Sequence, residues 1–154
     1  MKTVKSQSLQ DLYGKDFCTW AEKTANILQL QDWNALDLEH LIEEVLDLSK
    51  SQQRSLQSAL RLVLSHLLKW KYQSQRRSRS WELTITRERL NLEELLQESP
   101  SLRRFLEDAA WIDATYQRSR REAMVETGLV AESFPVTCPF RLVEILDLDF
   151  YPES

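Results

Sequence analysis

Apolar residues recur at three- and four-residue steps along most of the chain, which is the spacing of one face of an α-helix. The first stretch follows Asp16, a good N-cap, and reaches Leu28. A second begins after Asp37, another capping residue, and reaches Leu48. The third, at about residues 51–72, is apolar on more than one side, which is typical of a helix in the middle of a bundle.

Turn signals separate these stretches from one another and from later ones. Ser49, Lys50 and Ser51 interrupt the apolar pattern, so we predict a break between the second and third helices. After a polar connection, Trp81 and Ile85 belong to a stretch that alternates as a strand does. Its apolar positions nevertheless continue at helical spacing into the following residues, which favours one helix over about residues 81–97.

The last third of the chain carries clear start and stop signals. Ser99 followed by Pro100 predicts a new helix, and Gly128 predicts its end near Thr127, because glycine readily takes the left-handed conformation. A short helix is expected at about residues 140–146, and the aromatic tail beyond it should dock on the bundle.

The pattern as a whole predicts an all-α protein, a bundle of about five or six helices around a central apolar helix at about residues 51–72. Two glycines and four prolines are too few for the many turns of a β-sandwich. We expect a single helical domain over residues 9–152, preceded by a disordered tail at residues 1–8.

Charge and cysteine content narrow the class of protein. A formal net charge of -4 gives no overall attraction to nucleic acid or to an anionic membrane. Cys18 and Cys138 lie far apart and form no metal-binding or redox pair, which suits a reducing compartment. The N-terminus has no apolar core of the signal-peptide kind, and no apolar run approaches a membrane span. We therefore expect a cytoplasmic protein without membrane contact.

The sequence resembles one bacterial family over about residues 12–152. The similarity is carried by LYGKDFCTWAEKTANIL, LDLEHLIEEVLDL, HLLKWKYQ, RRSRSW, the ETGL turn and TCPFRLVEILDLDFYP, in that order. The family is the "domain of unknown function 29", which is especially frequent in cyanobacteria. The resemblance implies an all-helical fold and no established activity. The family pattern usually has a glycine where this chain has Ser49 or Lys50.

Five residues form a candidate functional cluster: Glu43, Glu44, His66, Lys69 and Arg77. Titratable side chains that face one another on neighbouring helices could transfer protons, but no nucleophile motif or cofactor fingerprint accompanies them. The interpretation we favour is a buried ion-pair network. In it, Arg77 pairs with the carboxylates of Glu39, Glu43 or Glu44. The catalytic residues stay unassigned.

A metal-dependent enzyme is the second alternative, and its site would lie in the same region. His40 and Glu44 share a helix face, and His66 with Glu43 could complete a site. The repeated Glu-x-x-His spacing of di-metal bundles does not occur, however. We therefore expect no metal and no cofactor, and a hydrogen-bonded structural His66.

Basic and aromatic residues intermingle between the third and fourth predicted helices. Such a mixture can bind phosphates and stack on bases, so nucleic-acid binding or processing at about residues 69–89 is the alternative function. Its candidate contacts are Lys69, Lys71, Arg76, Arg77 and Arg79. Because no catalytic motif is present and helix faces are abundant, we favour a protein-interaction or adaptor module whose partner is another protein or a second copy of the chain.

Overall fold

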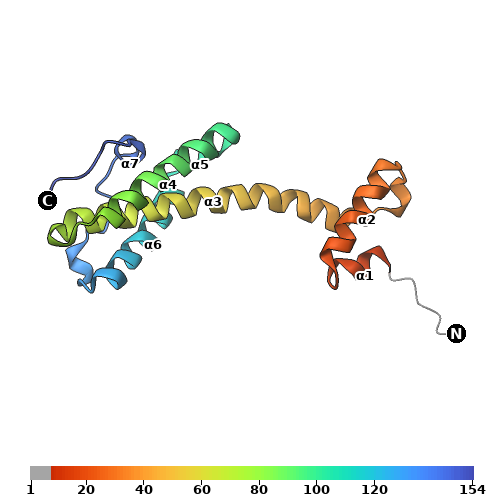
Figure 1. Cartoon of the computed structure of the whole chain (residues 1–154), viewed down its shortest axis with the longest axis horizontal. Helices are drawn as coiled ribbons and strands as arrows, with labels where there is room; N and C mark the ends of the chain where they lie inside the picture. The colour runs from red at the N-terminus through yellow and green to blue at the C-terminus, as the bar shows by residue number, and fades with distance from the viewer. Residues whose placement is uncertain (1–7) are drawn as a thin grey trace. The chain divides into compact units, whose positions relative to one another are not determined.

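The computed structural model describes residues 8–154 and consists of helices joined by short connections (Figure 1). Residues 1–7, which belong to the predicted tail, lie outside the described residues. Across the described residues every regular element is helical, which confirms the all-α prediction. The α-helices are α1 (Leu9–Tyr13), α2 (Phe17–Gln29), α3 (Leu38–Tyr72), α4 (Arg79–Glu98), α5 (Arg103–Leu106), α6 (Ala109–Thr127) and α7 (Leu142–Leu146).

The chain divides into two compact units. The N-terminal unit extends to Lys50 and the C-terminal unit comprises Ser51–Ser154. Helix α3 contributes its first part to one unit and its remainder to the other. The single domain expected over residues 9–152 stays a prediction.

The N-terminal helices begin at capping residues. The Ser8 hydroxyl accepts a hydrogen bond from the Asp11 backbone N–H at 3.1 Å and starts α1. Asp16 caps α2, as predicted, because its carboxylate accepts from the Thr19 backbone N–H at 3.1 Å. Ser8 is therefore the N-cap of the first helix.

Helix α3 corrects the prediction of two separate helices around residues 49–51. It is continuous from Leu38 to Tyr72, so the central helix is longer than the predicted residues 51–72. Serine and lysine in a helix interior cost only about 0.5 kcal/mol relative to alanine, too little to end a helix that is held at both ends. The glycine that would weaken the helix more strongly is absent here.

Helix α4 settles the ambiguity of its first turns. Ser78 caps it by accepting from the Trp81 backbone N–H at 3.3 Å, and the helix includes the whole strand-like stretch. Ile85, Leu92 and Leu96 are buried along one face, whereas Leu83 is exposed. The helical interpretation is confirmed, since helical spacing and not alternation predicts which side chains are buried.

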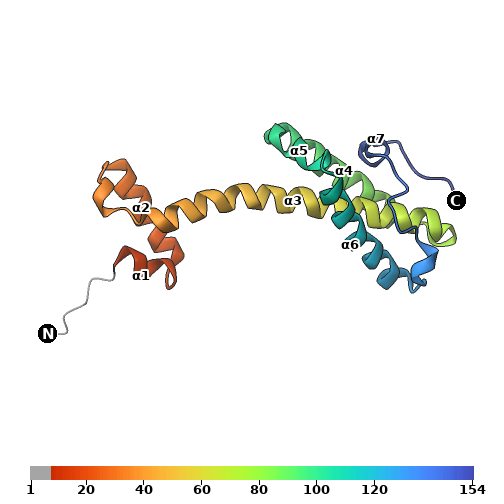
Figure 2. The ribbon, with the colours of Figure 1, turned by 180° about the vertical axis from the view of Figure 1, so that it is seen from behind.

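The helix expected over residues 100–127 is interrupted once. A 3₁₀ turn and α5 come first, and α6 starts only after Asp108 (Figure 2). The Asp108 carboxylate accepts hydrogen bonds from the backbone N–H groups of Ala110 and Trp111 at 2.9 and 3.2 Å. Asp108 is therefore the N-cap of α6, which the sequence pattern did not indicate. Gly128 ends α6 with a φ of 71°, the left-handed conformation that the sequence predicted.

The core of the C-terminal unit surrounds the second part of α3. The cluster of buried apolar residues takes side chains from α3, α4, α5, α6, α7 and the connections between them. The C-terminal tail docks as predicted, with the Tyr151 ring 4.8 Å from the Trp70 ring and the Phe150 ring 6.3 Å from the Phe140 ring. Leu64 and Leu67 are both fully buried, as expected for the centre of the bundle.

Leu67→Ala should lower the free energy of unfolding by about 2–5 kcal/mol, because it removes buried methyl groups and leaves a cavity. Urea denaturation followed by circular dichroism measures this loss. The matched control is Leu83→Ala on α4, whose side chain is 53% exposed and whose loss should cost about 0.5 kcal/mol at most. Similar losses in both variants would show that the core has been placed wrongly.

Candidate functional site

The candidate cluster of five residues is divided between the two units. Glu43 and Glu44 belong to the N-terminal unit, and His66, Lys69 and Arg77 belong to the C-terminal unit. Glu44 accepts a hydrogen bond from the Tyr13 hydroxyl at 2.7 Å, and Glu43 is exposed. The two parts of the cluster therefore have different neighbours.

The buried side chains of His66 and Lys69 form a polar cluster with Glu126, an exposed residue at the end of α6. His66 Nδ1 lies 2.8 Å from the Leu62 carbonyl oxygen, which fits a proton on Nδ1. Nε2 then accepts from the Lys69 ammonium, 3.3 Å away. That ammonium also forms an ion pair with Glu126 and lies 5.0 Å from the centre of the Trp81 ring. Lys69 is only 3% exposed, so these neighbours replace most of the water around its ammonium group.

The surroundings of His66 favour its neutral form. Burial lowers the pKa of His66, and the neighbouring Lys69 charge lowers it further. The C-terminal unit has two grooves, of about 470 and 500 Å³, and His66 lines neither of them. In the described part of the chain, His, Cys, Asp and Glu side chains form no group of three that could hold a metal ion. These contacts suit a histidine that fixes helix packing.

His66 should make stability depend on pH. Because the folded pKa lies below the ordinary value of 6.5, the unfolded chain takes up the proton first as the pH falls. The free energy of unfolding should thus be highest above about pH 6.5 and decline below it, and His66→Gln should flatten this slope. Urea titrations between pH 5 and 8 measure the slope, and an NMR titration should give His66 a midpoint below 6.5. A midpoint above 6.5 would contradict the assignment.

Within the C-terminal unit, Arg77 binds a backbone carbonyl group and the C-terminal residue, and its expected pairing with Glu39, Glu43 or Glu44 of the N-terminal unit stays a prediction. Its Nε donates to the Trp70 carbonyl oxygen at 2.8 Å, and Nη2 donates to the Ser154 hydroxyl at 3.0 Å. The guanidinium lies 5.1 Å from the centre of the Trp70 ring. Arg77 thereby stabilises the carboxyl end of α3, where unpaired carbonyl groups favour a cation.

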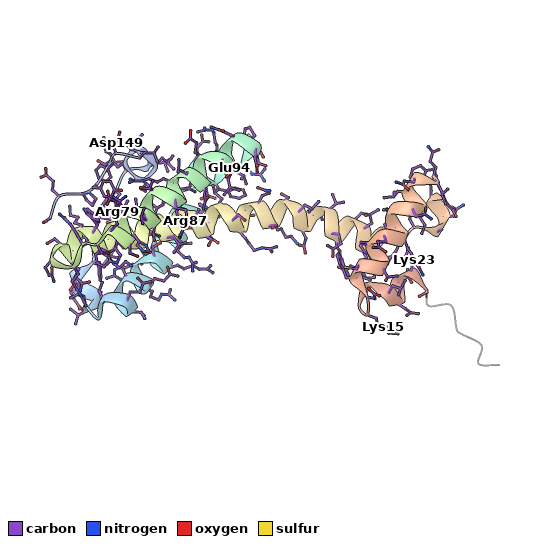
Figure 3. All side chains as sticks on the ribbon, in the orientation of Figure 1. Lys15, Lys23, Arg79, Arg87, Glu94 and Asp149 are labelled. Atoms are coloured by element: carbon purple, nitrogen blue, oxygen red, sulfur yellow. The ribbon has the colours of Figure 1, made fainter. Side chains whose placement is uncertain are left out.

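The other cations proposed to bind nucleic acid differ in accessibility. Arg76 and Arg79 are exposed, and Arg79 lies 3.3 Å from Glu82 on the same helix. Lys71 is half-buried beside the Tyr72 ring. Figure 3 shows Arg79 at the start of α4 and Arg87 further along the same helix. Lys69 is buried, whereas Arg77 is exposed although it is hydrogen-bonded, so four of the five proposed contacts remain accessible.

Arg89 has a role that the sequence did not reveal. It is 2% exposed and donates to three backbone carbonyl oxygens: Ile145 at 2.8 Å, Phe150 at 2.9 Å and Glu144 at 3.1 Å. Burial lowers the pKa of this guanidinium. Because all three acceptors lie in α7 or just after it, Arg89 ties the C-terminal segment to α4.

Asp37 organises the N-terminal unit. Its carboxylate oxygen Oδ2 accepts from the Trp20 indole N–H at 3.1 Å and lies 2.6 Å from His40 Nδ1. Burial alone would raise the pKa of Asp37, but the hydrogen bonds from His40 and Trp20 lower it below its ordinary value. The Tyr13 ring stacks on the His40 ring, with 3.9 Å between the ring centres. The hydrogen bond from the Tyr13 hydroxyl to Glu44 raises the pKa of Tyr13 to about 12. This network joins α1 and α2 to the start of α3.

The apolar core of the N-terminal unit is unusually small. Of the apolar side chains described in it, Leu12 and Trp20 are buried. In contrast, nine large apolar side chains of the same unit are more than a third exposed: Phe17, Leu28, Leu30, Trp33, Leu38, Ile42, Val45, Leu46 and Leu48. Scattered exposed apolar residues are normal on a protein surface, but these nine are concentrated on one small unit.

Part of this exposed surface continues the buried face of α3. Four exposed residues of α3 each lie 18 residues, or about five helical turns, before a fully buried residue of the C-terminal unit. These four residues are Leu38, Ile42, Val45 and Leu46. Those four buried counterparts are Leu56, Leu60, Val63 and Leu64. The same side of the helix is therefore packed in its later turns and open in its first turns. We call the open part, Leu38, Ile42, Val45 and Leu46, the α3 face.

Acidic residues border the α3 face. Three acidic residues, four positions apart from one another, each come directly after a member of the α3 face. They are Glu39, Glu43 and Asp47; all three are exposed, and we call them the acidic strip. Residues 1–50 hold nine acidic and five basic side chains, whereas residues 51–154 hold fifteen of each. In the described part of the N-terminal unit the basic ones are Lys15 and Lys23, which Figure 3 shows, and Lys50. The net charge of the protein is thus concentrated in the N-terminal unit.

Comparison with known proteins identifies the family without supplying an activity. Among the described residues, no helix combines the length and apolarity required to cross a membrane. No curated protein and no solved structure matches the chain. A family model matches residues 12–151, nearly the whole sequence, and the chain therefore belongs to the family described as "Domain of unknown function DUF29".

Proposed function

We propose that the protein is an interaction module that binds another protein through its N-terminal unit. The observation that carries this proposal is the contrast between two buried apolar side chains and nine exposed large ones in that unit. Burying apolar surface is the main favourable term in protein association. A unit that leaves so much of it exposed gains stability when a partner covers it.

The chemistry of the C-terminal unit fits the same function. His66, Lys69 and Glu126 satisfy one another, and Arg77 and Arg89 are bound to backbone carbonyl groups. These polar groups hold the helices in place, which is what a scaffold requires. The C-terminal unit then supplies the folded support, and the N-terminal unit supplies the binding surface.

Site-specific photo-crosslinking in cells tests this function. A photoreactive amino acid at Val45, which is 57% exposed, should give a discrete protein adduct, and Ile42→Asp in the same chain should abolish it. The matched control carries the photoreactive group at Leu83, which is 53% exposed on the C-terminal unit, and should give no such adduct. Identical products from both positions, or an adduct unaffected by Ile42→Asp, would overturn the proposal.

A further inference from the structure

We infer that the partner docks as an amphipathic helix with a basic flank along the α3 face. This inference rests on the proposed interaction function and names the kind of partner that the surface fits. It depends on three features of α3: the spacing of its exposed apolar residues, the acidic strip beside them and the charge of the unit to which both belong.

The spacing of the α3 face suits a helix as the occupant. Leu38, Ile42 and Val45 follow one another at four- and three-residue steps, which is the seam along which two helices pack side by side. Five turns later, other helices of this chain cover the same side of α3. A partner helix would therefore continue, along the first turns of α3, the packing that the chain itself provides further on.

The acidic strip selects the charge of that helix. In helix pairs, charged residues that flank the apolar seam form ion pairs across it and decide which partner is accepted. Glu39 and Glu43 are exposed, and Asp47 lies 3.4 Å from Lys50 on its own helix. Lysine or arginine on the partner would be attracted to these carboxylates, and aspartate or glutamate would be repelled.

The same charge argues against two other occupants. A second copy of the chain would bring a second unit with nine acidic and five basic residues against the first, so like charges would meet. An anionic lipid surface would be repelled for the same reason. A basic helix from another protein is the occupant that satisfies both the apolar and the charged part of the surface.

Two synthetic peptides of about 20 residues, long enough to form a helix, provide the probes. Both carry the same leucine seam, one flanked by lysine and the other by glutamate. We expect fluorescence anisotropy to show that the lysine peptide binds at least about tenfold more tightly, and that added salt weakens it. Ile42→Asp should lower the affinity for the lysine peptide by more than about tenfold, because a charge would enter the apolar seam.

Charge-neutral variants isolate the acidic strip. The triple variant Glu39→Gln, Glu43→Gln, Asp47→Asn should lower the affinity for the lysine peptide at least about fivefold and reduce the salt dependence of that affinity. The matched control neutralises Glu93 and Glu94, an exposed acidic pair on α4, and should leave the affinity unchanged, as should Leu83→Asp.

The outcomes separate this inference from the proposed function. Equal affinity of the two peptides, or lysine-peptide binding that Ile42→Asp leaves intact, would overturn the basic helix as occupant. A concentration-dependent dimer in sedimentation equilibrium that Ile42→Asp abolishes would instead identify a second copy. In each of these cases the crosslink at Val45 would still report whether the N-terminal unit binds a protein.

Discussion

Arg89→Met should lower the free energy of unfolding of the C-terminal unit by about 3–5 kcal/mol. The side chain donates three hydrogen bonds to carbonyl oxygens while almost completely buried, and hydrogen bonds from a charged donor are worth about 1.5–3 kcal/mol each. Methionine keeps most of the volume but leaves the three acceptors without a donor. Urea denaturation followed by circular dichroism measures the loss.

A matched control for Arg89→Met lies on the same helix. Arg79 has a side chain that is 77% exposed and is paired with Glu82, so Arg79→Met should cost about 0.5 kcal/mol at most. Hydrogen exchange locates the effect, because amides in α7 should lose protection in the Arg89 variant before those in the centre of α3. Equal losses in the two variants would contradict the role assigned to Arg89.

The elements of the fold were predictable wherever one helix pattern was uninterrupted. Asp16 and Gly128 act as the cap and the stop that the sequence indicated, and the helical interpretation of residues 81–97 is confirmed. The errors occurred at weak signals. The Ser-Lys-Ser segment at residues 49–51 lacks a true helix breaker, and Asp108 caps α6 although no glycine or proline marks the break before it.

The contacts between distant polar residues were much harder to predict. His66 is buried and hydrogen-bonded, as expected, but its cluster includes Glu126, which lies 57 residues beyond Lys69. Arg77 and Arg89 bind backbone carbonyl groups, and every residue offers such a group, so no acidic partner in the sequence could point to them. Long-range pairing depends on tertiary packing that spacing alone does not encode.

The exposed apolar surface of the N-terminal unit was visible only as a pattern in the sequence. Spacing predicts that Leu38, Ile42 and Val45 share one face with the acidic strip beside it, and the structure shows that this face is exposed. Periodicity cannot distinguish an apolar face packed within the chain from one left for a partner. The distinction depends on whether neighbouring helices of the chain cover the face, which only the structure shows.

The small core of the N-terminal unit leads to the second large effect, on Trp20. Trp20 is 2% exposed, its indole N–H donates to Asp37, and its ring lies 5.0 Å from that of Tyr13 and 5.4 Å from that of Phe17. Trp20→Ala should cost about 3–5 kcal/mol, and it removes one of the two apolar side chains buried in the unit. We therefore expect α1 and α2 to unfold in this variant.

Hydrogen exchange resolved by residue tests this expectation for Trp20→Ala. Amides of α1 and α2 should lose their protection, whereas those of Leu60 to Leu68, in the core of the C-terminal unit, should keep it. Trp33→Ala is the matched control, because Trp33 belongs to the same unit but is 63% exposed and should change stability by about 0.5 kcal/mol at most. Retained protection of α2 in the Trp20 variant, or an equal loss in the Trp33 variant, would show that the N-terminal unit does not depend on its buried tryptophan.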